Sequence, residues 1–117
     1  MGYWTSFSFN MWDKDDQWIE EDSSIYEKVC KKFEEVTDID SGEFEEMYHY
    51  ALTTKWYEWE EDMKKIVADF PDIKFEIEGY GEDRTDWWVA QWYNGEYAIE
   101  YVVPPKGKLF KAALLAQ

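Results

Sequence analysis

Carboxylate groups dominate the chemistry that this 117-residue chain can offer, with 27 Asp and Glu against 12 Lys and Arg and a formal net charge of −15. Paired carboxylates carry out glycoside hydrolysis, and tryptophan beside an acidic residue is typical of sugar-binding clefts. A chain with so many acidic residues contains such pairs by chance. Residues 1–12 also lack the basic flank and continuous apolar run of a secretion signal. The pairs alone therefore do not indicate a glycosidase.

Nucleophilic and zinc chemistry have few residues to draw on. The single cysteine, Cys30, excludes an internal disulfide, and the single histidine, His49, excludes a zinc site built from several Cys and His ligands. No recognisable motif places a serine or cysteine beside His49 for nucleophilic catalysis. We expect a structural histidine, and a semi-buried thiol next to the apolar stripe of a helix.

Two acidic turns and a glycine pair fall short of known ligand-binding loops. Residues 13–16 and 38–42 could offer oxygen atoms to Ca²⁺, but neither stretch has the spacing of an EF-hand loop. Gly79 and Gly81 lack the third glycine of a dinucleotide-binding loop, and Glu82 behind them would repel a phosphate. The sequence predicts no catalytic residue, no metal site and no cofactor.

Acidic runs beside aromatic residues indicate binding instead. Before residue 104 the chain has nine basic and 27 acidic residues, a net charge of −18, which is similar to the roughly 20 phosphates in one turn of B-DNA. This charge would repel nucleic acid and steer a basic protein toward the surface, while Trp and Tyr anchor the contact. The hypothesis requires the carboxylates to form one contiguous stripe. The predicted partner-binding residues are Trp12, Asp13, Asp15, Asp16, Trp18, Glu58, Glu61, Asp62, Tyr80, Glu82, Asp83 and Asp86.

The first half of the chain predicts a strand and a helix, followed by an ambiguous segment. Residues 3–12 alternate in hydrophobicity with the period of a strand. Ser24 and Glu27 have the spacing of a capping box before a helical stripe of Ile25, Val29, Phe33 and Val36. Turn formers occupy residues 37–42. Residues 43–54 fit either a helix or a strand, and we favour a strand from about Met47 onward.

The second half predicts one more helix and three strands. An apolar stripe of helical period begins near Trp56, and Pro71 ends that helix. Residues 73–77 alternate as a half-buried strand, which residues 79–83 leave through a flexible connection. Asn94-Gly95 is the strongest short hairpin signal and joins strands at residues 87–93 and 96–103.

A two-residue turn fixes the register of this hairpin, so Tyr93 should lie opposite Glu96 and Trp88 opposite Tyr101. One face of the hairpin should belong to the core, with Trp88, Ala90, Trp92, Tyr97, Ile99, Tyr101 and Val103. The other face, which includes Trp87 and Tyr93, mixes aromatic and acidic side chains. We expect this second face to be at least partly exposed to solvent.

The order of elements, β-α-β-α-β-β-β, predicts an α+β fold. We expect an antiparallel sheet with two helices on one face, ferredoxin-like with an added strand. Residues 1–103 should form a single domain. Residues 104–117 contain three lysines and no acidic residue. This tail either forms a short amphipathic helix against the acidic body or is a frayed terminus.

The middle of the chain contains a pattern of turn glycines, core aromatics and acids, made up of Lys55, Trp56, Tyr57, Glu60, Glu61, Asp62, Phe75, Gly79, Gly81, Glu82, Asp83, Asp86, Trp88, Asn94 and Gly95. This pattern resembles small uncharacterised proteins of phages and mobile elements with a YubB-type ferredoxin-like domain. The resemblance covers about a third of the chain. It implies a ferredoxin-like fold and a phage origin, and it brings no catalytic residue with it.

Three hypotheses for function follow from these patterns. The first is a non-enzymatic, phage-type acidic inhibitor, anti-CRISPR or anti-restriction, that occupies the nucleic-acid groove of a host defence nuclease such as a CRISPR effector. The second is a small-ligand binding domain that uses the aromatic hairpin face around Trp87 and Tyr93. The third is a subunit of a larger assembly. No apolar run approaches the roughly 20 residues of a membrane helix, so we expect a cytoplasmic monomer or homodimer.

Overall fold

The computed structural model describes residues 2–83 and 85–102. In chain order its elements are β1 (Thr5–Trp12), α1 (Ser24–Val36), α2 (Ser41–His49), β2 (Leu52–Thr54), α3 (Trp59–Val67), β3 (Lys74–Gly81), β4 (Trp87–Tyr93) and β5 (Glu96–Tyr101). The strands form one antiparallel sheet in the order β2-β1-β3-β4-β5. The predicted α+β class is confirmed, but the described residues contain three helices rather than two. No helix among them is long and apolar enough to cross a membrane.

The predictions for the basic tail and for Val103 fall outside the residues that the structure describes.

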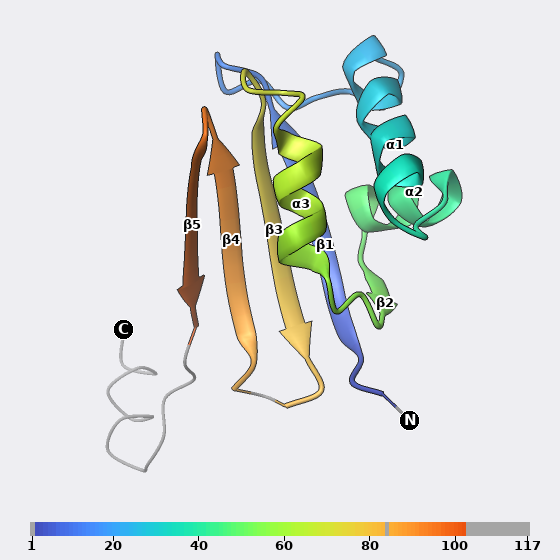
Figure 1. Ribbon diagram of the computed structural model, residues 1–117, viewed down its shortest axis with the longest axis vertical. Helices are drawn as coiled ribbons and strands as arrows, with labels where there is room; N and C mark the ends of the chain where they lie inside the picture. The colour runs from blue at the N-terminus through green and yellow to red at the C-terminus, as the bar shows by residue number, and fades with distance from the viewer. Residues whose placement is uncertain (1, 84, 103–117) are drawn as a thin grey trace, which may run out of the picture.

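A single aromatic core lies between the sheet and the helices (Figure 1). Phe9 of β1 is fully buried, and its ring lies 5.4 Å from Phe33 of α1, 5.3 Å from Phe44 of α2 and 5.9 Å from Phe75 of β3. α3 adds the buried side chains of Met63 and Ile66 to this core. Three helices and the central strands therefore share one apolar interior.

The N-cap of α1 lies one residue earlier than predicted. Ser23, rather than Ser24, is the N-cap, and its hydroxyl accepts a hydrogen bond from the Tyr26 backbone amide at 3.2 Å. Ser23 has the extended backbone that an N-cap residue needs, whereas Ser24 is already helical. The predicted stripe is correct at Val29 and Phe33, which are buried.

The preference for a strand from Met47 is wrong, because residues up to His49 belong to α2. Asp40 and Glu43 form a complete capping box at the start of this helix. Phe44 and Met47 then lie on the buried side of the helix. Only Leu52–Thr54 pairs with β1 as a strand.

The C-terminal end of α2 lies next to the part of β1 that the short strand β2 does not pair with. The Tyr48 hydroxyl donates to the carbonyl oxygen of Ile19 at 2.6 Å, and the Ser8 hydroxyl donates to the carbonyl oxygen of Tyr50 at 3.1 Å. These bonds satisfy polar groups at the sheet edge. They also fix the position of His49, the last residue of the helix.

The flexible connection predicted after residue 78 is instead strand. Gly79, Tyr80 and Gly81 belong to β3 and pair with both β1 and β4. The reason is steric, since a side chain at Gly79 would overlap the indole ring of Trp88 on β4. Glycine at this position therefore allows close packing and does not break the strand.

The β4–β5 hairpin has the predicted register, with Tyr93 opposite Glu96 and Trp88 opposite Tyr101. Asn94 and Gly95 both have positive φ, 52° and 80°, as a type I′ turn requires. Trp88, Ala90 and Trp92 are buried as expected.

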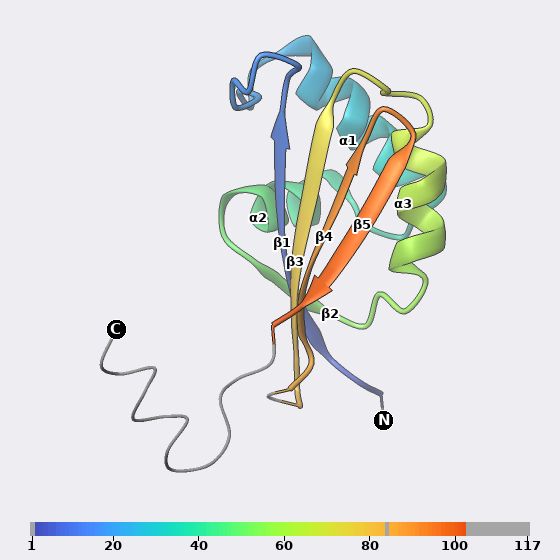
Figure 2. The ribbon, with the colours of Figure 1, turned by 90° about the vertical axis from the view of Figure 1, so that its left-hand side faces the viewer.

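The core prediction fails for β5. Tyr97 and Tyr101 are 45% and 61% exposed, and Ile99 is only partly buried. β5 is the outer strand of the sheet, and α3 packs on β4 instead, where Trp59 stacks on Trp88 with ring centroids 4.0 Å apart. Figure 2 shows β5 on the side nearest the viewer, with no described element beyond it. Its outer edge is therefore unpaired in the part of the chain that the structure describes.

Candidate binding surface and a carboxylate–histidine cluster

The sheet face opposite the core carries no helix in the described residues, and we call it the open face. Its side chains alternate with the buried ones along β1, β3, β4 and β5, and none of them is buried. They are Ser6, Ser8, Asn10, Trp12, Lys74, Glu76, Glu78, Tyr80, Trp87, Val89, Gln91, Tyr93, Glu96, Ala98 and Glu100. The open face is polar and acidic in its middle and aromatic at both ends.

Two carboxylates at the centre of the open face are held in place. Glu76 accepts a hydrogen bond from the Gln91 side-chain amide at 2.8 Å, and Glu78 accepts one from the Trp87 indole nitrogen at 2.8 Å. Each bond occupies one carboxylate oxygen, so the other oxygen can face a partner. Because both groups are fixed before binding, less side-chain entropy is lost when a cation docks.

Aromatic rings lie at each end of this acidic centre. At one end the Tyr80 and Trp87 rings meet edge to face, with centroids 5.8 Å apart. At the other end the Lys74 ammonium lies 5.2 Å from the Tyr93 ring centroid and also forms an ion pair with Asp16. That ion pair raises the pKa of Lys74, because the Asp16 carboxylate favours the charged form. The only lysine of the open face is therefore already neutralised by a neighbour.

Eight of the twelve predicted partner-binding residues gather on the open face and on the two loops at its ends. Trp12 and Tyr80 belong to the face itself, where Trp12 lies opposite Lys74 and Tyr80 opposite Ser6. The loop after β1 carries Asp13, Asp15 and Asp16, and the loop between β3 and β4 carries Glu82, Asp83 and Asp86. The two loops lie at opposite ends of the sheet, and the Asp86 carboxylate points to the core side, next to the core-facing position of Gly81.

Several of these loop acids also hold the chain in shape. The Asp13 carboxylate accepts hydrogen bonds from the backbone amides of Asp15 at 2.9 Å and Gln17 at 3.0 Å. Glu82 accepts a hydrogen bond from the Trp4 amide at 2.6 Å, which ties this loop to the start of β1. These hydrogen bonds order the loops, so the loops present their acids in defined positions.

The other four predicted residues lie away from the open face. Trp18 stacks on Tyr48, with centroids 4.7 Å apart and planes at 7°, so one side of its ring is covered. Glu58, Glu61 and Asp62 lie at the start of α3 in the helical layer. Asp62 accepts a hydrogen bond from the Trp56 indole nitrogen at 2.8 Å. The structure does not join these four to the surface formed by the other eight.

The expectation that the carboxylates form one contiguous stripe is wrong, so the inhibitor hypothesis can rest only on the subset that lies on the open face and its end loops. Ten lie on the open face or its end loops: Asp13, Asp15, Asp16, Glu76, Glu78, Glu82, Asp83, Asp86, Glu96 and Glu100. The other 17 of the 27 lie on the helices and their connections. The helical layer also carries six lysines, Lys28, Lys31, Lys32, Lys55, Lys64 and Lys65.

No protein family, curated protein or solved structure matches this chain. Its surfaces are therefore interpreted from geometry and charge.

Sequence reasoning did not include four open-face acids among the partner-binding residues: Glu76 and Glu78 at the centre of the face, and Glu96 and Glu100 on the outer strand β5. The alternation of residues 73–77 already placed the first of them on the polar side of a strand. What the alternation could not indicate is that no helix covers that side, because helix placement depends on contacts between elements far apart in the chain.

A groove of about 530 Å³ lies on the opposite side of the hairpin, between α3 and β5. Its lining includes Val67, the last residue of α3, and Phe70, which follows the helix. The stacked rings of Trp92 and Tyr97 also line it. The Tyr97 hydroxyl donates to Glu60 of α3 at 2.6 Å. Burial and the Glu60 charge raise the pKa of Tyr97. The groove thus lies beside β5, whose Tyr97 side chain was described above as exposed.

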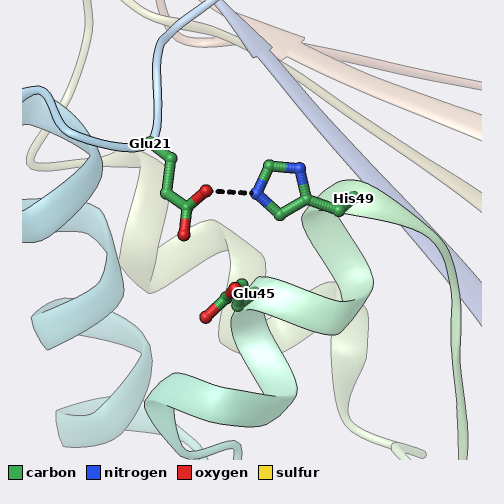
Figure 3. A group of neighbouring side chains, drawn as sticks. All are labelled: Glu21, Glu45 and His49. Carbon is green, nitrogen blue, oxygen red and sulfur yellow. Dashed lines mark hydrogen bonds and ion pairs between the residues drawn. The ribbon is translucent and has the colours of Figure 1, made fainter.

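A third feature, shown in Figure 3, brings together the single histidine and two glutamates. His49 and Glu45 lie one turn apart on α2, and Glu21 comes from the loop before α1. The His49 Nε2 atom lies 2.8 Å from a Glu21 carboxylate oxygen. One ligand atom from each residue lies within 4.8 Å of the other two. The expectation of a purely structural histidine did not anticipate this cluster, because only the fold brings Glu21 to α2.

Cys30 lies inside the core, where burial raises the pKa of its thiol. A thiol that resists ionisation is a poor nucleophile. The expected semi-buried thiol is thus more deeply buried than predicted.

Tyr26 presents a buried polar atom that lacks a partner. Its side chain is 8% exposed, and its hydroxyl forms no hydrogen bond within the described residues. An unpaired buried hydroxyl costs about 1–3 kcal/mol. We expect Tyr26→Phe to raise the free energy of unfolding by about 1 kcal/mol in metal-free urea denaturation.

Tyr48→Phe is the matched control for this prediction. The Tyr48 hydroxyl donates to the carbonyl oxygens of Ile19 and Met11, so its loss should lower stability by about 1–2 kcal/mol. Equal destabilisation by both substitutions would show that the Tyr26 hydroxyl has a partner in solution.

Proposed function

We propose that this protein is a non-enzymatic inhibitor whose open face occupies the nucleic-acid-binding groove of a basic protein. The target class that fits best is a host defence nuclease, such as a CRISPR effector or a restriction enzyme, and the resemblance to phage proteins supports this choice. The observation that carries the proposal is the uncovered acidic sheet face with an acidic loop at each end.

The dimensions of the open face support this proposal. The eight residues of β1 span about 23 Å at the rise of a strand. Duplex DNA of that length carries about 14 phosphates, and the open face with its end loops carries the ten carboxylates named above. Because Lys14 and Lys74 also lie there, the described residues of this surface carry a net charge of about −8, somewhat more than half that of the DNA. Such a surface could lie in a groove built for DNA, with Tyr80, Trp87 and Tyr93 as contact anchors.

A binding role also agrees with the state of the reactive side chains. Cys30 is buried, and His49 pairs with Glu21. Neither lies beside a hydroxyl or thiol nucleophile among the hydrogen bonds of the described residues. We therefore propose a binding protein, monomeric or dimeric, that acts in the cytoplasm of the host cell without a cofactor.

The test starts with capture of binding proteins from a bacterial lysate on the immobilised full chain, identified by mass spectrometry. The affinity of the captured protein is then measured for the wild type and for the double substitution Glu76→Gln and Glu78→Gln. Glutamine keeps the hydrogen-bond acceptors for Gln91 and Trp87, so folding should persist. We expect the dissociation constant to rise at least about tenfold, because two fixed charges are lost from the contact.

Glu34→Gln with Glu35→Gln on α1 is the matched control, because it removes the same charge from the helical layer. This control should change affinity less than about twofold. Raising NaCl from 50 to 500 mM should weaken wild-type binding strongly, and duplex DNA should compete with the captured protein. Binding that is indifferent to salt, to DNA and to the open-face substitutions would contradict the proposal.

The groove between α3 and β5 supports a second candidate function, the binding of a small apolar ligand. Aromatic walls and a few polar groups are typical of such sites. The hydrogen bond between Tyr97 and Glu60 provides a polar point within it. A ligand in this groove would bind almost independently of salt, which separates the two functions.

The ferredoxin-like description remains a proposal about the architecture. Strands β2 and β3 both pair antiparallel to β1, so they run parallel to each other with β1 between them. The connection through α3 is thus a split β-α-β unit, the building block of ferredoxin-like folds. β4 and β5 extend the sheet as a meander on the other side.

A further inference from the structure

The cluster of Glu21, Glu45 and His49 has the ligand chemistry of a metal site. Imidazole nitrogen together with carboxylate oxygens suits borderline divalent ions, above all Zn²⁺, Co²⁺ and Ni²⁺. We propose that these three residues bind a divalent transition-metal ion, with Zn²⁺ as the best-fitting probe. Three protein ligands would leave at least one coordination position for water. This inference is independent of the inhibitor function proposed above.

The distances need only small adjustments to hold an ion. Ligand atoms bonded to one metal at about 2.1 Å lie roughly 3.0–3.4 Å from each other. The His49 nitrogen and the Glu21 oxygen are now 2.8 Å apart, and all three ligand atoms lie within 4.8 Å. Glu45 forms no hydrogen bond or ion pair with another described residue, so its flexible side chain can turn inward by the remaining distance.

The surroundings of His49 fix its ring and favour a cation. The ring meets those of Trp18 and Tyr48 edge to face, with centroids 6.2 Å and 5.6 Å apart. His49 is also the last residue of α2, where the unpaired carbonyl groups of a helix attract positive charge. The loop that carries Glu21 is held by a hydrogen bond from the Ser23 hydroxyl to the Glu20 carbonyl at 2.7 Å.

Tyr26 supplies a second, independent observation. It is more than nine-tenths buried, and its hydroxyl has no partner among the described residues. Its ring centroid lies 5.3 Å from that of Tyr48, the neighbour of His49. Burial raises the pKa of Tyr26 most, and the charges of Cys30, Glu21 and Glu45 raise it further.

The experiment titrates the full chain with zinc chloride by isothermal calorimetry in 150 mM NaCl and excess Mg²⁺. Because the chain carries a net charge of −15, salt and Mg²⁺ are needed to suppress diffuse attraction of cations. We expect saturable binding of one Zn²⁺ per chain. His49→Gln and Glu45→Gln should each lower the association constant at least about tenfold.

Glu46→Gln is the matched control, because it makes the same charge change one residue away on α2, outside the cluster. It should leave zinc affinity within about twofold of the wild type. No saturable binding, or equal weakening by Glu45→Gln and Glu46→Gln, would overturn the proposal in favour of diffuse charge attraction.

A second measurement guards against variants that fail to fold. Circular dichroism without metal checks each fold, and the Tm is then measured with and without zinc. An ion that binds the folded chain raises its Tm by mass action. The rise should appear for the wild type and for Glu46→Gln and should be lost in His49→Gln. A rise that persists in folded His49→Gln would place the ion elsewhere and overturn the assignment.

Discussion

Replacing Phe9 by alanine is expected to lower the free energy of unfolding by about 3–5 kcal/mol. Phe9 is fully buried and its ring contacts Phe33, Phe44 and Phe75, one from each helix of the N-terminal half and one from β3. The truncation removes apolar contacts and leaves a cavity lined by three other elements, α1, α2 and β3, so it cannot collapse easily. Domains have only about 5–15 kcal/mol of stability in total. Equilibrium urea denaturation followed by far-UV circular dichroism measures the loss.

The matched control is Tyr80→Ala on the open face. This ring is 46% exposed and lies outside the core, so its truncation should change stability by less than about 1 kcal/mol. A similar loss for both variants would mean that the open face is packed against something in solution. That result would contradict the two-layer arrangement described above.

Replacing Gly79 by alanine should lower stability by about 1–3 kcal/mol. The new methyl group would overlap the Trp88 indole, and Trp88 cannot retreat without losing its stack on Trp59, whose centroid lies 4.0 Å away. The loss corresponds to a fall in Tm of roughly 5–20 °C for a domain of this size. Thermal unfolding measures it, and near-UV circular dichroism reports whether the tryptophan stack is disturbed.

The same substitution at Gly42 should have the opposite sign. Gly42 lies in the first turn of α2, and a methyl group there would meet only an Asp40 oxygen at an ordinary 3.5 Å. Alanine restricts the unfolded chain and suits a helix, so stability should rise by up to about 0.5–1 kcal/mol. If Gly79→Ala were as benign as Gly42→Ala, then Trp88 would not pack against β3 as the structure has it.

Local patterns predicted the elements whose signals are contained within a few residues. The alternation of residues 3–12 marks β1, and Phe7 and Phe9 are buried as the alternation requires. Asn94-Gly95 fixes the hairpin register because the turn itself contains the needed positive φ angles. The helical stripe predicted from about Trp56 likewise marks α3, although the helix begins at Trp59 and ends at Val67, before the predicted stop at Pro71.

Predictions failed where a contact distant in sequence decides the outcome. Residues 47–51 fit either period, and the Asp40–Glu43 capping box together with the contact of Phe44 with Phe9 favours the helix. Gly79 has the composition of a turn, but the Trp88 side chain on the next strand makes it a packing position. The exposure of Tyr97 depends on where α3 lies across the sheet, which no local pattern encodes.

The candidate sites also combine features that local patterns predicted with features that depend on contacts distant in sequence. Acidic loops at Asp13–Asp16 and Glu82–Asp86 were recognisable as charge runs, but their placement at opposite ends of the β1–β3 pair depends on strand pairing. Two of the three residues in the cluster of Glu21, Glu45 and His49 could be brought together from the sequence. Glu45 and His49 have the i, i+4 spacing that puts them on one helix face. Glu21 joins them only through the folded path of the loop before α1.

The outer edge of β5, unpaired among the residues that the structure describes, gives the abundant carboxylates a further role. This strand has no lysine, proline or bulge that would deter another strand from pairing with it. Mutual repulsion between chains of charge −15 is then what keeps two such edges apart in dilute buffer. Strong salt or acid weakens that repulsion and favours self-association through this edge; under the proposed inhibitor function, the same conditions would also release the partner.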